Sequence, residues 1–401
     1  MLGKINVFLR SIALLLTMSL AAPVGLHAQA ELPMPKKVSR HVTDTLQLSY
    51  INHLPVVKVS INGRSFNFLI DTGSSICASF SPEINQQLTG LMSMEITPEE
   101  GASSRLTVGK LESLEIGRHQ FRDVYMSARN LQSVRCTGID GLIGYSVLRK
   151  LCIKFDVRKG ICAISDDNTI VKSENKDRKV SFETTHGGMP IFKVSPLPRI
   201  DQSVGFDTGS SEFYVLSESH YQAQKNIFSR ALRDIAYGGN ARLSLFGYDH
   251  QELRRKFVFP TFKLGEISIR NTEAQLIVDQ NSYLGGALLE LGALTLDYRN
   301  GNYYLQTYET ISSAPPMKDL TIVPSNKGLE IGVVWRMSSA YQKGVRAAQR
   351  VISVNGEPVT DPCQTLYRIA QGEILSLTTV DDEGNTYKWE DEAAMRRERS
   401  N

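Results

Sequence analysis

The chain repeats one short pattern, and this repeat constrains the fold more than any other feature. A strand-like run from Pro55 leads to Phe-Leu-Ile-Asp-Thr-Gly-Ser-Ser at 68–75, and a similar run from Pro190 leads to Gly-Phe-Asp-Thr-Gly-Ser-Ser at 205–211. A self-similar pattern at this separation indicates two structural units of the same kind. We place these units at about 45–165 and 180–308.

Later landmarks support the same division. The hydrophobic triplets Leu142-Ile143-Gly144 and Tyr283-Leu284-Gly285 follow the two Asp-Thr-Gly copies in the same order. Short alternating runs with Gly- and Asn-rich turns dominate both units, which is typical of β-strands. The sequence therefore predicts a mainly β fold with two lobes, joined by the charged stretch 166–179.

The N-terminus has the features of a secretory signal peptide. Lys4 and Arg10 precede a short apolar run, and an Ala-x-Ala pattern ends at Ala30. We expect residues 1–30 to be removed and the protein to be exported, either periplasmic or secreted. An N-terminal membrane anchor stays open as an alternative, although the run is short for a bilayer. No membrane span is expected in the mature chain.

Composition excludes several classes of function. The formal net charge is only +3, so no basic field indicates nucleic-acid binding. The seven His residues form no H-E-x-x-H motif, and the five Cys residues form no C-x-x-C motif. We therefore expect no metal and no cofactor.

The paired Asp-Thr-Gly motifs predict a pair of carboxylates. One copy alone could be a turn in which Asp bonds its own backbone, but two copies at matching positions favour a site. If a pseudo-twofold axis relates the lobes, Asp71 and Asp207 meet at that axis. Two carboxylates about 3 Å apart share a proton, because both cannot ionise cheaply. The ionised member can then activate water, and the protonated member can donate to a carbonyl.

The neighbours of these carboxylates are expected to support them. The glycines leave room for backbone N–H groups, the threonines bond across the axis, and the serine hydroxyls donate to the outer carboxylate oxygens. The supporting residues are Thr72, Gly73, Ser74, Thr208, Gly209 and Ser210.

These motifs resemble the signature pairs of aspartic proteases. The two lobes in one chain are similar to pepsin, and their size is more similar to retropepsin units. The resemblance implies two pseudo-symmetric retropepsin-like β-barrel lobes, a polypeptide substrate in the cleft between them, and hairpin flaps. One departure is that the first flap region, 92–109, contains no Tyr. A second flap at 237–248 is predicted, with a plain surface hairpin as the alternative.

A different pattern begins after the linker at about 314. Gly344-Val345 and the run 351–359 resemble a PDZ domain, which implies a small α+β module that can bind a peptide by strand addition. A packing or spacing role is the alternative. The module departs from the family at Ala348-Gln349, where Gly-Asp is usual, and at Glu330, where Gly is usual.

The predicted domains are a signal peptide at 1–30, lobes at 31–170 and 171–312, and a PDZ-like domain at 313–395. Cys152 and Cys162 could pair across a hairpin or could be buried small side chains, and no catalytic thiol is expected. The predicted function is aspartic endopeptidase activity. The alternative is a non-catalytic peptide-binding protein that keeps the bilobal fold.

Overall fold

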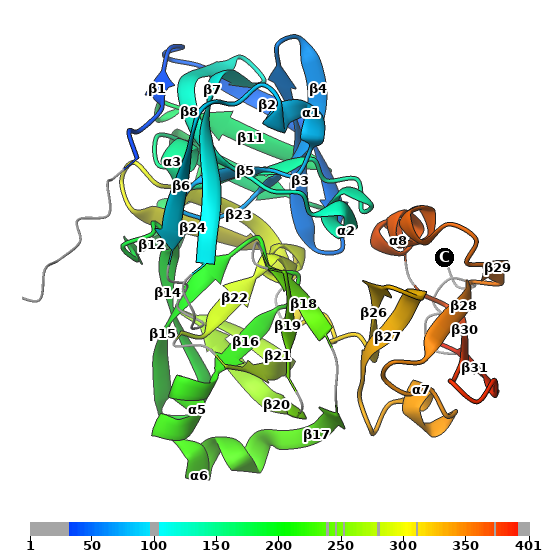
Figure 1. The fold of residues 1–401 in the computed structure, drawn as a ribbon. Coiled ribbons are helices and arrows are strands. Elements are labelled where there is room, and N and C mark those ends of the chain that lie inside the picture. Colours follow the sequence, from blue (N-terminus) through cyan, green and yellow to red (C-terminus); the bar gives the residue numbers. More distant parts are fainter. Residues whose placement is uncertain are drawn as a thin grey trace, which may run out of the picture. The chain divides into compact units, whose positions relative to one another are not determined.

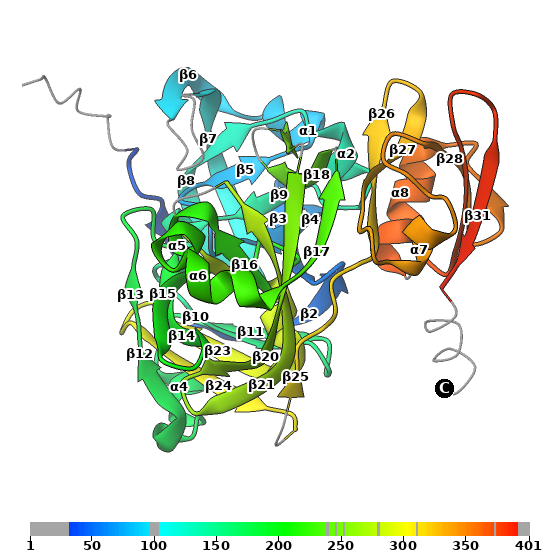
Figure 2. The ribbon, with the colours of Figure 1, turned by 90° about the horizontal axis from the view of Figure 1, so that it is seen from below.

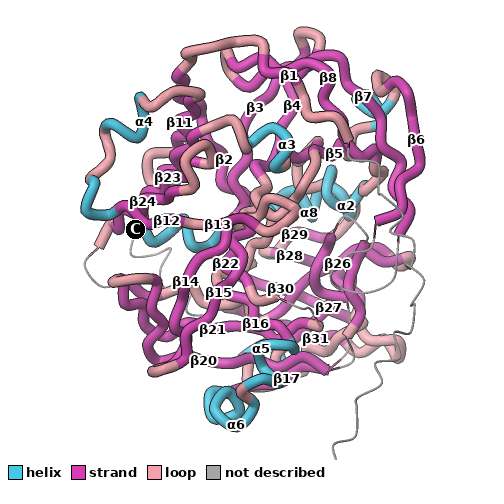
Figure 3. Tube along the Cα trace, turned by 90° about the vertical axis from the view of Figure 1, so that its left-hand side faces the viewer, coloured by secondary structure: helices cyan, strands magenta, loops and turns pink. Residues whose placement is uncertain are grey.

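The computed structural model describes residues 32–96, 104–237, 240–244, 247–251, 253–278, 281–309, 312–372 and 374–391. Residues from Met34 onward belong to one compact unit. The predicted signal peptide lies outside the described residues. Within the described ranges, no helix has the length and apolar character needed to cross a membrane. Strands make up most of the described chain (Figure 3), so the prediction of a mainly β fold is confirmed.

The first lobe is a strongly bent sheet in which the strands follow the order β2-β3-β4-β9-β5-β8-β7-β6 (Figure 1). Its core comes from alternation with one shift: in β8, His119 and Phe121 are buried, and after Asp123, whose φ of 56° lies in the left-handed region, the buried apolar positions are Val124 and Met126. The strands are β1 (Lys36–Lys37), β2 (Thr43–Ile51), β3 (Leu54–Ile61), β4 (Arg64–Ile70), β5 (Cys77–Ser79), β6 (Thr89–Ile96), β7 (Ser104–Ile116), β8 (His119–Ala128), β9 (Gly141–Ile143), β10 (Cys152–Asp156) and β11 (Ile161–Ser165). The short helices are α1 (Pro82–Asn85), α2 (Gln132–Arg135), α3 (Tyr145–Leu148) and α4 (Thr169–Lys172), followed by the 3-10 turn η1 (Lys176–Arg178).

The second lobe repeats this topology. Its order β14-β15-β22-β16-β21-β20 matches β3-β4-β9-β5-β8-β7 of the first lobe strand for strand. The strands are β12 (Lys179–Ser181), β13 (Glu183–Thr184), β14 (Pro190–Leu197), β15 (Ile200–Asp207), β16 (Tyr214–Ser217), β17 (Leu232–Tyr237), β18 (Asn240–Ser244), β19 (Gly247–His250), β20 (Leu253–Leu264), β21 (Ile267–Ile277), β22 (Tyr283–Gly285), β23 (Gly292–Asp297), β24 (Asn302–Thr307) and β25 (Ser312–Ser313). The helical turns are α5 (Glu218–Ala223), α6 (Lys225–Phe228), η2 (Ser229–Ala231) and η3 (Gly286–Leu291). The repeat in the sequence is therefore a repeat of sheet topology.

The lobes are joined by a shared sheet. β10 of the first lobe pairs antiparallel with β23, so that Cys152 lies opposite Asp297 and Phe155 opposite Leu294. One large buried cluster also contains residues from both lobes. The two lobes consequently share hydrogen bonds and hydrophobic burial.

Each of the two predicted flap regions contains a pair of antiparallel strands. β6 pairs with β7, and the tip between Ile96 and Ser104 lies outside the described residues. β18 pairs with β19 in a separate two-stranded sheet within the predicted second flap.

The C-terminal module has its own sheet, in the order β26-β27-β28-β30-β31, with two helices packed beside it (Figure 2). Its elements are β26 (Leu320–Ser325), β27 (Gly328–Val334), α7 (Ser339–Gln342), β28 (Arg350–Val354), β29 (Glu357–Pro358), α8 (Pro362–Gln371), β30 (Ser376–Val380) and β31 (Thr386–Glu390). Asp361 caps α8, because its side chain accepts hydrogen bonds from the backbone N–H groups of Cys363 and Gln364. The C-terminal module therefore combines strands and helices in one small α+β unit.

The cysteines follow one of the two predicted alternatives. Cys136 and Cys363 form a disulfide between the first lobe and α8, whereas Cys77, Cys152 and Cys162 are free and buried. The pairing of Cys152 with Cys162 is therefore wrong. The strand register explains this, because β10 and β11 place Ser165 opposite Cys152 and Phe155 opposite Cys162.

Candidate active site

Each Asp-Thr-Gly loop begins where a strand ends beside a short parallel strand. Asp71 follows β4 and donates its backbone N–H to the Ile143 carbonyl (3.0 Å), while Asp207 ends β15 opposite Gly285 of β22. Gly144 and Gly285 must be glycine, because a Cβ atom there would lie 2.3 and 2.1 Å from the carbonyl oxygens of Ile76 and Glu212. The two hydrophobic-Gly triplets thus let the Asp loops fold back over them.

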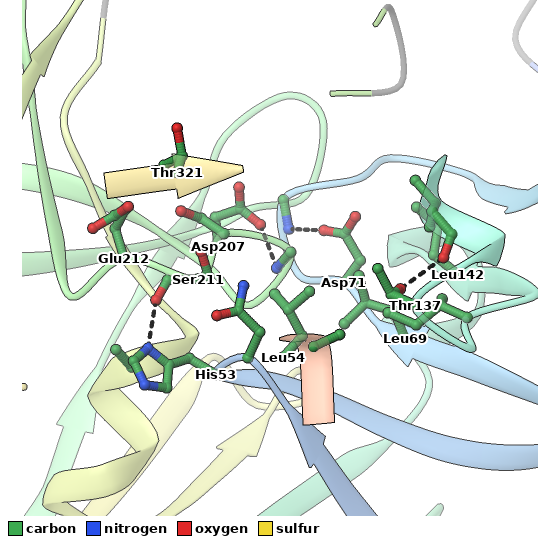
Figure 4. A pocket seen from close by; sticks show the side chains of 18 of the residues that line it. His53, Leu54, Leu69, Asp71, Thr137, Leu142, Asp207, Ser211, Glu212 and Thr321 are labelled. Atoms are coloured by element: carbon green, nitrogen blue, oxygen red, sulfur yellow. Dashed lines mark hydrogen bonds between the residues drawn. The ribbon is translucent and has the colours of Figure 1, made fainter. Parts of the chain in front are cut away.

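The structure brings Asp71 and Asp207 together from opposite lobes (Figure 4). Asp71 Oδ1 accepts hydrogen bonds from the backbone N–H groups of Gly73 (2.9 Å) and Ser74 (3.0 Å). Asp207 Oδ1 accepts one from Gly209 (2.8 Å). A Cβ on Gly73 would lie 2.4 Å from Asp207 Cγ, and a Cβ on Gly209 would lie 2.7 Å from Asp71 Cγ. Each glycine therefore faces the carboxylate of the other lobe.

Beneath the carboxylates, Thr72 and Thr208 form a reciprocal hydrogen-bond lattice. The Thr72 N–H donates to Thr208 Oγ1 (3.1 Å), and the Thr208 N–H donates to Thr72 Oγ1 (2.9 Å). Each hydroxyl donates in turn to a carbonyl of the opposite lobe: Thr72 to Phe206 (2.6 Å) and Thr208 to Ile70 (2.5 Å). Both threonines are fully buried. The lattice fixes the two loops relative to each other.

We expect Thr208→Val to lower the free energy of unfolding by at least about 2 kcal/mol, because the Thr72 N–H and the Ile70 carbonyl each lose a buried partner. Thr208→Ser keeps the hydroxyl and serves as the matched control, with a smaller loss. Urea denaturation of both variants measures the difference. A larger loss in Thr208→Ser than in Thr208→Val would show that the methyl group, not the hydrogen bonds, carries the effect.

The side chain of Ser74 differs from the prediction. Ser74 Oγ donates to the Ile76 carbonyl (2.8 Å), so the expected hydroxyl bond to Asp71 is wrong. The turn of the loop points the Ser74 side chain away from the carboxylate and directs its backbone N–H toward it. The Ser210 backbone N–H donates to the Asp207 backbone carbonyl (3.2 Å), and the bond from the Ser210 hydroxyl to a carboxylate stays a prediction.

The environment favours a proton on the carboxylate pair. Burial raises the pKa of Asp71 well above its ordinary value, and the charge and hydrogen bond of Asp207 raise this pKa further. The N–H groups of Gly73 and Ser74 offset only part of that effect. Among the described residues, no cluster of three His, Cys, Asp or Glu side chains could hold a metal ion.

This shift gives a prediction for stability. Since the folded state raises the pKa of Asp71 above 3.8, the folded protein holds a proton that the unfolded chain releases. The stabilisation is complete below pH 3.8 and is lost as pH rises through the folded pKa. We therefore expect Asp71→Asn to raise Tm at neutral pH. This gain in Tm should disappear below pH 3.8. Calorimetry across pH measures it, and a gain that does not vary with pH would contradict the linkage.

The carboxylates open into a cleft of about 750 Å³ lined by both lobes and the C-terminal module. Six of the eight predicted residues line it, namely Asp71, Gly73, Ser74, Asp207, Gly209 and Ser210. The two threonines lie buried beneath the cleft.

Two neighbours were not predicted from the sequence. His53 contacts the second Asp loop, with Nδ1 2.9 Å from the Ser211 carbonyl oxygen and Nε2 3.0 Å from Glu290 Oε1. The Tyr298 hydroxyl is buried and has no hydrogen-bond partner among the described residues, and burial together with the charges of Asp71 and Asp207 raises its pKa. Comparing the two repeats points to Tyr298. It directly follows Asp297, whereas the equivalent Asp156 of the first lobe is followed by Val157. No sequence pattern signals His53.

Comparison with protein families agrees with this geometry. Residues 57–147 match the aspartyl protease family. The matched segment runs from β3 to α3 and contains Asp71 together with the triplet ending at Gly144. No curated protein matches the chain. Among solved structures, the crystal structure of basic 7S globulin from soybean is similar with 12% sequence identity and a TM-score of 0.41, over 67% of this chain and 96% of that chain.

Proposed function

We propose that the protein is an aspartic endopeptidase. One observation carries the proposal: two carboxylates from topologically equivalent loops, Asp71 and Asp207, meet in an open cleft and are held by backbone N–H groups of their own loops. The match of residues 57–147 to aspartyl proteases supports it. A binding protein has no physical need for a second carboxylate beside the first, because two adjacent like charges cost free energy unless the pair shares a proton.

The chemistry follows from the singly protonated pair. The ionised carboxylate takes a proton from a water molecule while the water oxygen attacks the peptide carbonyl carbon. The protonated carboxyl donates its proton to the carbonyl oxygen, which gives a gem-diol. As the C–N bond breaks, the leaving nitrogen takes the proton held by the pair, and one gem-diol hydroxyl gives its proton to the pair as the C=O bond re-forms, so that the pair again holds one proton. This shared proton belongs to the pair rather than to either Asp.

The test is hydrolysis of a quenched-fluorescent peptide library, with mass spectrometry of the products. We expect cleavage that EDTA leaves unchanged and that a hydroxyl-containing transition-state analogue of the statine type blocks. Binding without any cleavage would favour the non-catalytic peptide-binding alternative. Inhibition by EDTA at constant pH would contradict the mechanism.

The proposal includes the finer domain assignment: retropepsin-like lobes at 31–170 and 171–312 and a PDZ-like domain at 313–395. Equivalent sheet orders in the two lobes support the first part. For the module, the support is the element order and Ala348, whose φ of 66° lies in the left-handed region where the PDZ pattern has Gly. A peptide ligand at this module is tested by titrating the isolated C-terminal peptides of cleaved substrates against the full chain.

Export is also part of the proposal. The basic and apolar N-terminal residues support it, and so does the Cys136–Cys363 disulfide, since disulfides persist mainly in oxidising compartments. Cell fractionation of the full chain, beside a version lacking residues 1–30, tests this. Recovery of the full chain from the cytoplasm with both cysteines reduced would contradict export.

A further inference from the structure

The C-terminal module lines the same cleft as the candidate dyad. Part of this lining comes from β26, which is an edge strand of the module's sheet. Its Thr321 is one of the lining residues drawn in Figure 4, together with Glu212 and Asp207. Another part comes from Leu366, Ile369 and Ala370 of α8 and from Ile374 beyond it. The module therefore forms a wall of the cleft.

The first lobe holds α8 along its length. The disulfide joins Cys363, near the start of α8, to Cys136. At the other end, Gln371 Nε2 donates to the Thr137 carbonyl (3.4 Å), and between them the Tyr367 ring approaches Gly138, where an added Cβ would lie 3.0 Å away. Residues 363, 367 and 371 share one helix face, because they are spaced by four.

The second lobe holds the other side of the module. The Arg336 N–H donates to the Ile235 carbonyl (3.1 Å), and the Met337 N–H donates to Asp234 Oδ2 (3.0 Å). The Lys256 ammonium lies 5.0 Å from the centre of the Trp335 ring. Attachment to both lobes makes α8 a fixed part of the cleft.

An apolar surface connects the dyad to α8. Leu69 and Leu142, which belong to the strands beside Asp71, are part of a buried cluster that continues through Val134 to Ala370 of α8. All of these leucine, valine and alanine side chains also line the cleft. The smallest of them, Ala370, is contributed by the module.

We infer that α8 completes an apolar subsite on the Asp71 side of the cleft, and that this subsite selects a large apolar side chain of an extended polypeptide substrate. The inference rests on the proposed function. An apolar side chain gains free energy by leaving water at such a surface, whereas a charged or small side chain does not. The C-terminal module is then a specificity-determining part of the enzyme, with Ala370 of α8 and Val134 of the first lobe both lining the subsite.

Two variants of the full chain test the subsite in opposite directions. The substrates are matched peptides that carry Phe, Leu or Ala at each position around the scissile bond. Ala370→Leu narrows the subsite and should lower the Phe-to-Ala ratio of kcat/KM at one position by roughly tenfold or more. Val134→Ala widens the subsite and should move the preference toward the larger side chain. Gln364→Leu, on an exposed part of the same helix, is the matched control and should leave the ratio unchanged.

A binding measurement separates this inference from the proposed function. The same peptides are titrated by fluorescence anisotropy into the Asp71→Asn protein, with and without each subsite substitution, and Tm confirms folding. The subsite is overturned if a subsite substitution changes the affinity for Phe and Ala peptides equally, or if neither substitution changes any affinity. This result holds whether or not the wild-type protein cleaves the peptides. A size preference in binding without hydrolysis would support the subsite and refute the peptidase.

Discussion

Replacing Asp71 or Asp207 with Asn is expected to lower kcat/KM by at least about 10⁴-fold, or ~5 kcal/mol of transition-state stabilisation. Asn keeps the shape of the side chain but can neither accept the proton of water as a carboxylate nor share a proton across the lobes. Because the two carboxylates act as one unit, the double variant should be no worse than either single variant. Steady-state hydrolysis of the best library peptide measures these losses.

Folding must be shown to survive in these variants. The expected rise of Tm for Asp71→Asn at neutral pH provides that control, because a misfolded protein would show the opposite. Substantial hydrolysis in either single variant would remove the assignment of Asp71 and Asp207 as the dyad. A loss in only one of them would point to a single-carboxylate mechanism.

Gly73→Ala is expected to lower kcat/KM by at least about 10²-fold, since displacing a reacting group by about 1 Å has this effect. The new Cβ would lie 2.4 Å from Asp207 Cγ and must displace that carboxylate from its partner. Gly187→Ala is the matched control. It also lines the cleft, but its Cβ would have no neighbour closer than 3.8 Å.

The reciprocal change, Gly209→Ala, should behave like Gly73→Ala, because its Cβ would lie 2.7 Å from Asp71 Cγ. If Gly73→Ala retains full activity, the carboxylates do not meet as the structure has them. If Gly187→Ala lowers kcat/KM as much as Gly73→Ala does, the loss comes from general crowding of the cleft and not from displacement of Asp207.

The position of the dyad could be predicted from the sequence because its signal is local and repeated. Asp-Thr-Gly after a strand-like run occurs twice at matching places, so the end of each strand and the pairing of Asp71 with Asp207 both follow. The hydroxyl direction of Ser74 could not be predicted in the same way. It depends on a single backbone turn, which presents the Ile76 carbonyl in place of the carboxylate.

Long-range features were also beyond the sequence. Cys136 and Cys363 are separated by 227 residues, and no spacing rule connects them. From the sequence, Cys152 and Cys162 could form a disulfide or remain two separate buried thiols. Only the register of β10 and β11 decides between these alternatives. The place of α8 in the cleft wall depends on contacts with Cys136 and Thr137 that no periodicity reveals.

The sheet shared by the lobes has a consequence for how the chain is made. A ribosome delivers β10 (Cys152–Asp156) well before its partner β23 (Gly292–Asp297). Until then, one side of β10 presents unpaired backbone groups, which are a template for pairing with other chains. Contacts between residues so distant in the chain also slow folding. The nascent first lobe therefore has an aggregation-prone edge that only the nearly complete second lobe can cover, and protection by a chaperone during synthesis would matter most in that interval.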